Sequence, residues 1–212
     1  MRSFRLNLIR CGTTEMTEQG RCEGSTDKPL TASSSAALRE LKNDPLLAYP
    51  EAGVLFCSPY LRCRQTAEIL FPDTAVNVYG ELTEYGFGSF EGLTRDELSK
   101  IPEYAAWVTG GADAAPPGGE SSEAFAKRLS AVFTKLTDKM MVTSARNVTI
   151  ITTGGVIMSL MASFAVPVQP MNKWITMPGR GFTVRTEPML WNVRKWEWSE
   201  NLPYDVEDTD EQ

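Results

Sequence analysis

The strongest constraint on the fold is a repeated unit in which a short apolar strand runs into a turn and then into a helix. In the clearest copy, the β-branched segment 147–152 precedes Gly154 and Gly155, and an apolar helix is expected over 156–164. Further strands are expected at 4–10, 54–57 and 75–79, and further helices at 31–43, 59–70 and 121–141. This alternation predicts a three-layer α/β sandwich, a mostly parallel central sheet flanked by helices.

The rest of the chain is expected to decorate that sheet within a single domain, residues 1–212. A segment from about 94 to 122, with short helices at 95–100 and 102–108, is predicted to be an insertion that caps the strand ends. The segment 174–198 is expected to give two antiparallel or edge strands, and the acidic tail from Glu207 a frayed end.

The amino-acid composition excludes several classes of catalytic site and partner. The 212 residues include no histidine, which excludes histidine-ligated metals, histidine general bases and phosphohistidine. The net charge of −6 argues against nucleic acid as a partner, because phosphate neutralisation needs a concentrated basic surface. No apolar run has the length of a signal peptide or a membrane span, and the four cysteines show no CxxC spacing. We therefore expect a cytoplasmic protein with free thiols that does not bind membranes.

Three chemically active segments fall where predicted strands end. They are Arg10-Cys11-Gly12, Ser58-Pro-Tyr-Leu-Arg62 and Thr152-Thr-Gly-Gly155. Ligands of open α/β sheets bind beyond the carboxyl ends of the strands, so we expect these segments to converge on one pocket.

Arginines are the expected anion ligands in that pocket. Arg10 ends a strand, Arg62 lies in the first turn of a helix, and Arg21 lies in a glycine-flanked loop. A planar guanidinium can hold a phosphate or carboxylate through two hydrogen bonds. The alternative is that each arginine forms a surface ion pair.

Cys11, Glu84 and Thr153 are the other candidates. A Cys11 thiol among guanidinium groups would ionise readily and could act as a nucleophile, or it could simply fill space. Glu84 lies among aromatic residues, where desolvation suits a general acid, although it could instead cap a loop. Backbone N–H groups at Thr153-Gly154 could hold an oxyanion, or the glycines could serve tight packing.

Six sequence blocks resemble those of the histidine phosphatase superfamily, the phosphoglycerate-mutase-like phosphatases and mutases. The family patterns are L-x-R-H-G-x-T, G-R-x-Q-G-x-x-D-x-P-L-T, S-P-L-x-R-A-x-Q-T-A, L-x-E-x-x-F-G-x-W-E-G, P-G-G-E-S and V-S-H-G-G-V-I. The matching blocks, in the same order, are Leu8-Ile-Arg-Cys-Gly-Thr-Thr14, the segment 20–31, the segment 58–67, the segment 82–92, the segment 117–121 and Ile151-Thr-Thr-Gly-Gly-Val-Ile157.

The resemblance implies a phosphoglycerate-mutase-like fold and a role for each matching position. In the family, the histidine of R-H-G attacks a phosphoryl group, and the arginines matching Arg10 and Arg62 bind its oxygens with the second histidine. The glutamate matching Glu84 protonates the leaving group, and neither metal nor cofactor is needed. Thr17, Arg21 and Gly154 are expected near the bound phosphate.

This chain departs from the family at both histidines, because Cys11 and Thr153 stand in their places. We therefore expect a catalytically impaired member that binds a phosphorylated small molecule, a protein partner or inorganic phosphate. One alternative is an active phosphatase or phosphotransferase with Cys11 as its nucleophile. Another is a thiol-based redox or interaction protein in which Cys11 and Cys22 pair. The substrate is not predicted, and the oligomeric state is open, a homodimer included.

Overall fold

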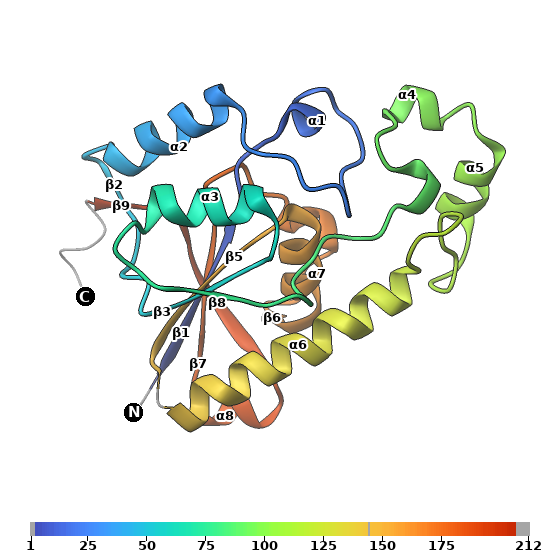
Figure 1. The fold of residues 1–212 in the computed structure, drawn as a ribbon. Helices are drawn as coiled ribbons and strands as arrows, with labels where there is room; N and C mark the ends of the chain where they lie inside the picture. The colour runs from blue at the N-terminus through green and yellow to red at the C-terminus, as the bar shows by residue number, and fades with distance from the viewer. Residues whose placement is uncertain (1–2, 144, 207–212) are drawn as a thin grey trace.

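A seven-stranded sheet forms the centre of the computed structural model, which describes residues 3–143 and 145–206 (Figure 1). The strand order is β4-β3-β5-β1-β7-β8-β6, and only β7 runs against the other six. The predicted three-layer, mostly parallel arrangement is therefore confirmed. The strands of the sheet are β1 (Phe4–Arg10), β3 (Val54–Cys57), β4 (Val76–Val78), β5 (Asn147–Thr152), β6 (Ala165–Val166), β7 (Gly181–Thr186) and β8 (Trp196–Leu202). A separate two-stranded sheet pairs β2 (Leu47–Ala48) with β9 (Tyr204–Asp205).

Helices cover both faces of this sheet. In Figure 1, α2 and α3 lie on one side, and α6 and α7 lie on the other. The helices are α1 (Glu15–Glu18), α2 (Ala32–Asn43), α3 (Leu61–Leu70), α4 (Arg95–Leu98), α5 (Pro102–Thr109), α6 (Ser122–Thr143), α7 (Gly154–Phe164) and α8 (Pro188–Asn192), with 3-10 turns at Gly88–Phe90 and Met171–Trp174. Within the described ranges, none of them is long and apolar enough to cross a membrane.

Strand alternation in β1 divides the core into two. Successive side chains of a strand point to opposite faces, so Leu6 and Leu8 pack with the α6 and α7 side chains. Ile9 and Cys11 instead belong to the buried cluster under α3, which also contains Cys57 and Cys63. The alternation of residues in this one strand therefore decides which side chains pack on each face of the sheet.

The predicted capping segment contains α4 and α5, which lie at the upper right of Figure 1, beyond the start of α6. Aromatic rings join this segment to the body of the protein. The Trp107 ring lies 5.8 Å from the rings of Phe90 and Tyr85, measured between centroids. These contacts hold the segment in a defined position.

Two features differ from the sequence prediction. The helix expected from Pro59 begins at Leu61, where Asp27 Oδ1 accepts a hydrogen bond from the Leu61 N–H at 2.6 Å. The C-terminal region gives two antiparallel strands, as predicted, because β7 pairs with β8, but β7 lies inside the sheet and β6 forms the edge. The amphipathic pattern of a strand does not show which neighbours it will pair with. The predicted frayed tail from Glu207 lies outside the described residues.

We expect Leu129→Ala in α6 to lower the free energy of unfolding by about 2–5 kcal/mol, because Leu129 is 1% exposed and its removal leaves a cavity. Val142→Ala on the same helix is the matched control. Val142 is 86% exposed, so the change should stay within about 0.5 kcal/mol. Urea unfolding measures both, and equal effects would contradict the packing described for α6.

Candidate functional site

The carboxyl ends of β3, β5 and β1 lie side by side and form the floor of the site. Ile151 of β5 is in register with Cys57 of β3 and Ile9 of β1. Just beyond, the Ser58 N–H donates to the Ile151 carbonyl at 2.9 Å, and the Cys11 N–H donates to the Thr152 carbonyl at 2.8 Å. The three segments predicted to converge are therefore neighbours at one edge of the sheet.

The glycine pair that opens α7 is packed against two of the predicted site residues. A Cβ on Gly154 would lie 3.2 Å from Arg10 Nε, and a Cβ on Gly155 would lie 2.2 Å from Glu84 Oε1. The Gly155 N–H donates to Glu84 Oε2 at 2.9 Å, and Arg10 Nη1 donates to the Thr176 carbonyl at 2.5 Å. The glycines are thus needed for close approach by a guanidinium and a carboxylate.

Arg62, the second predicted anion ligand, is buried at 3% exposure. Its Nη1 donates to the Thr26 carbonyl at 2.7 Å and to Glu23 Oε1 at 3.4 Å, and its Nη2 donates to the Gly24 carbonyl at 3.3 Å. The guanidinium also stacks over the Tyr60 ring, 4.0 Å from its centroid. Of five N–H donors, two are left without a partner among the described residues.

The carboxylate that pairs with Arg62 was not predicted. Glu23 is 7% exposed, and the Thr14 hydroxyl donates to its Oε2 at 2.6 Å. Burial raises the pKa of Glu23, while the Thr14 hydrogen bond and the Arg62 charge lower it in part. A signal was present in the sequence, since Glu23 stands where the quoted family pattern G-R-x-Q-G has a neutral glutamine.

Three charged groups of the predicted site act on Cys11. A hydrogen bond from the Cys63 thiol lowers the pKa of Cys11, as do the charges of Arg62 and Arg10, against opposing effects of burial and of Glu84. Both guanidinium groups and the Glu84 carboxylate therefore act on one sulfur atom. Cys63 was not among the predicted site residues, because its position in a helix gave no sign of an effect on Cys11.

Two buried hydroxyl groups at the strand ends have no hydrogen-bond partner among the described residues. They belong to Ser58, which is fully buried, and to Thr153, which is 4% exposed. Buried polar atoms are normally hydrogen-bonded, so such groups point to a partner that is not part of the chain.

Arg21 and Thr17, both predicted near the phosphate, make contacts elsewhere. Arg21 Nη1 donates to the Gly92 carbonyl at 2.7 Å and pairs with Glu97 at 3.2 Å, which ties its loop to α4. The Thr17 hydroxyl accepts from the Thr14 N–H at 2.7 Å and closes the first turn of α1. These contacts give both residues structural roles, and no contact among the described residues joins either of them to Cys11.

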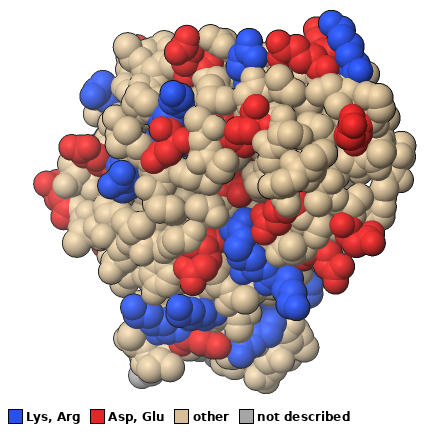
Figure 2. All heavy atoms as spheres, turned by 45° about the vertical axis from the view of Figure 1, so that its right-hand side comes forward, with Lys and Arg blue, Asp and Glu red and all other residues tan. Residues whose placement is uncertain are grey.

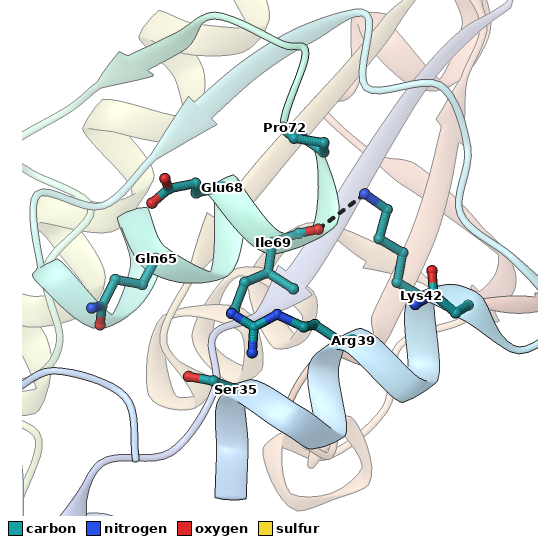
Figure 3. Close-up of a pocket in the computed structure, with 8 residues that line it drawn as sticks. Ser35, Arg39, Lys42, Gln65, Glu68, Ile69 and Pro72 are labelled. Atoms are coloured by element: carbon teal, nitrogen blue, oxygen red, sulfur yellow. Dashed lines mark hydrogen bonds between the residues drawn. The ribbon is translucent and has the colours of Figure 1, made fainter. Parts of the chain in front are cut away.

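Two hollows of the surface lie outside the candidate site, and the described residues that line them include none of the predicted site residues. One of about 430 Å³ lies between α2 and α3, where Lys42 Nζ donates to the Ile69 carbonyl at 3.0 Å and Arg39 points toward the opening (Figure 3). Another of about 280 Å³ is lined by Thr176, whose carbonyl holds Arg10. Across 3–143 and 145–206, no group of three or more cysteine or carboxylate side chains could hold a metal ion.

The charged groups that act on Cys11 and on Arg62 are of both signs. Arg10 and Arg62 contribute two positive charges, and Glu23 and Glu84 contribute two carboxylates. The nearby surface is mixed as well. Figure 2 brings the α4 and α5 side forward and shows acidic and basic side chains interspersed, with the basic ones gathered in the lower half. The site can offer directed N–H donors to an oxoanion, but its net field is weak.

Comparison with known proteins identifies the family. The profile of the Histidine phosphatase superfamily (branch 1) matches residues 6–199. An adenosylcobalamin/alpha-ribazole phosphatase of Salmonella typhimurium is 30% identical over 195 residues, which cover 90% of this chain and 89% of that protein. An acid phosphatase of Mycobacterium tuberculosis is 33% identical over 130 residues, 57% of each chain.

Solved structures give the same fold. The alpha-ribazole phosphatase of Shigella flexneri superimposes with a TM-score of 0.76 at 23% identity, covering 92% of this chain and 95% of that one. A Thermus thermophilus protein, TTHB049, superimposes with a TM-score of 0.63 at 28% identity, covering 95% of this chain and 100% of that one. The predicted phosphoglycerate-mutase-like fold is confirmed.

We expect the stability of Glu23→Gln, measured relative to the unchanged chain, to increase as pH rises from about 4 to about 7. Burial raises the pKa of Glu23, so the folded state binds its proton more tightly than the unfolded state does. Stability from this group is then full below the unfolded pKa and is lost as pH rises through the folded one, whereas glutamine does not titrate.

Urea unfolding of both proteins across that pH range measures the difference in the free energy of unfolding. A difference that stays constant or moves against the variant as pH rises would contradict this account of the buried carboxylate.

Proposed function

Since the chain belongs to the histidine phosphatase superfamily, we propose that it binds inorganic phosphate or a phosphorylated small molecule beside Cys11, without the family's phosphohistidine chemistry. The observation that carries the proposal is the convergence of the Arg10 and Arg62 charges on the Cys11 thiol. Two guanidinium groups around one point suit a tetrahedral oxoanion, because each can give parallel N–H donors.

Three further features support an anion at this position. Arg62 keeps two N–H donors without a partner in the described part of the chain. The buried Ser58 and Thr153 hydroxyls lack partners in the same part and could donate to phosphate oxygens. The α7 helix, eleven residues long, begins at Gly154, and its N-terminus carries partial positive charge.

Catalytic impairment follows from the two replaced histidines. Cys11 cannot form the phosphohistidine that the resemblance implies, and Thr153 is neutral where a second imidazole is expected. Loss of a single preorganised donor to a transition-state oxyanion typically costs about 10²–10³ in rate. Glu23 adds a buried carboxylate next to Arg62, which further weakens the positive field.

The class of ligand proposed is a phosphate monoester. Relatives named as adenosylcobalamin/alpha-ribazole phosphatases make alpha-ribazole phosphate the first metabolite to test as a ligand of this chain. We place this binding in the cytoplasm, a reducing compartment that suits the four free cysteines.

A second candidate function is phosphoryl transfer through Cys11. It is favoured by the lowered pKa of the Cys11 thiol, because the thiolate is the nucleophilic form. The sulfur would attack phosphorus, the alkoxide would leave, and water would then cleave the S–P bond. Glu84, whose carboxylate accepts from the Gly155 N–H, would give the alkoxide its proton as it leaves.

We expect inorganic phosphate at about ten times its dissociation constant to raise the melting temperature by about 3–6 °C, because binding to the folded state alone adds about 1.4 kcal/mol. Arg62→Ala should abolish this shift. Arg62→Lys should reduce it, because an ammonium group cannot form the paired hydrogen bonds. Arg39→Ala is the matched control, since Arg39 is an exposed arginine on α2 and the shift should persist.

Differential scanning calorimetry compares the shift of each variant with its own phosphate-free baseline. An undiminished shift in Arg62→Ala would contradict the assigned site. Steady turnover of p-nitrophenyl phosphate that Cys11→Ser abolishes would contradict the impaired state and establish the second candidate.

A further inference from the structure

Cys11 and Cys63 come from different elements and meet in the same buried cluster. Cys11 follows the last residue of β1 and is 5% exposed, and Cys63 lies in the first turn of α3 and is fully buried. We call these two residues the thiol pair. Neither the resemblance nor the proposed phosphate binding gives Cys63 a role.

The backbone contacts next to the thiol pair hold it in place. The Gly12 N–H donates to the Thr66 hydroxyl at 2.9 Å, which fixes the end of β1 against α3. Thr66 lies three residues after Cys63, so both side chains project from the same face of the helix. The Cys63 side chain is therefore directed at the segment that carries Cys11, and both side chains belong to one buried cluster.

We propose that the thiol pair is an oxidation site, in which a peroxide converts Cys11 and Cys63 to an intramolecular disulfide. The Cys11 thiolate attacks one peroxide oxygen and the O–O bond breaks, so that Cys11 becomes a sulfenic acid and the departing hydroxide takes up the proton that the Cys11 thiol had released, which gives one water. The Cys63 sulfur then attacks the Cys11 sulfur, its proton goes to the departing hydroxyl group, and a second water leaves. Two thiols lose two electrons and two protons, and one hydrogen peroxide becomes two waters.

The two cysteines differ in the way this sequence requires. The Cys63 thiol and the charges of Arg62 and Arg10 favour the thiolate of Cys11, which makes Cys11 the sulfur that attacks the peroxide first. Burial raises the pKa of Cys63 well above its usual value, so the Cys63 thiol keeps its proton until Cys11 has become a sulfenic acid. One cysteine reacts with the oxidant and the other resolves the product.

The remaining cysteines fit these roles less well. The sequence suggested Cys22 as the partner of Cys11, but burial and the Glu91 carboxylate raise the pKa of Cys22, and its backbone is tied to Gly92 and Leu93. Burial within β3 raises the pKa of Cys57 to about 12, which keeps it protonated.

Oxidation of the thiol pair would remove the Cys11 thiolate from the pocket that Arg10 and Arg62 share, whether or not phosphate binds there.

Peptide mapping tests this proposal directly. Trypsin cleaves after Arg10, Arg21, Arg62 and Arg64, so the four cysteines fall in four separate peptides. The reduced full chain is treated with one equivalent of hydrogen peroxide, alkylated and digested without reductant. We expect a cross-linked species that joins the 11–21 and 63–64 peptides, lacks two hydrogens, and separates on reduction.

Cysteine-to-serine variants show which cysteine forms the disulfide with Cys11. Cys63→Ser should remove the cross-link and leave a Cys11 sulfenic acid that dimedone traps, whereas Cys22→Ser and Cys57→Ser should leave the cross-link intact. A cross-link from Cys11 to Cys22, Cys57 or a second chain would overturn the proposal. So would a wild-type Cys11 that stays reduced or advances to sulfinic acid with no cross-link, and this result does not depend on any variant folding.

Discussion

The candidate site depends on the buried guanidinium of Arg62, which needs hydrogen-bond acceptors. The groups that accept from it fix the position of the surrounding segments. Removing a charge from water is costly unless it is paired and hydrogen-bonded. Arg62 satisfies that requirement with the Glu23 carboxylate and with the carbonyls of Gly24 and Thr26. The loop after α1 is thereby held over the strand ends, and Glu23 is fixed in turn by the Thr14 hydroxyl.

The same pairing limits what the site can do. Arg62 is held rigidly with donors to spare, which favours recognition of an oxoanion, yet its partner is a carboxylate where the family pattern has a neutral amide. Cys11 and Thr153 replace the two groups that would take and stabilise a phosphoryl group. The chain thus keeps the family's fold and the matching arginines, with a carboxylate beside Arg62 and a sulfur at position 11.

Periodicity predicted most of the sheet, because β1, β3 and β5 are short apolar runs that end at turns, and their observed bounds are those expected. The convergence of Arg10, Arg62 and Thr153 followed from parallel topology, since strand ends share an edge, whereas the place of Glu84 was implied by the family resemblance. The sequence pattern did not predict which side chains contact each other across the fold. Arg21 faces Glu97 across a long separation in sequence, and Cys63 faces Cys11, because such contacts depend on how α3 and the capping segment pack. A one-dimensional pattern holds no information about that packing.

Restoring the histidines tests the central claim most directly, namely that this pocket binds phosphate esters but lacks the groups for their chemistry. The double variant Cys11→His/Thr153→His is compared with the unchanged chain by steady-state hydrolysis of p-nitrophenyl phosphate and by trapping of acid-labile phosphoprotein. We predict that the double variant gains turnover by about 10²-fold or more, with phosphate on the residue at position 11, and that the unchanged chain shows neither. Turnover by the unchanged chain equal to that of the double variant, or no phosphate binding by either, would contradict the account.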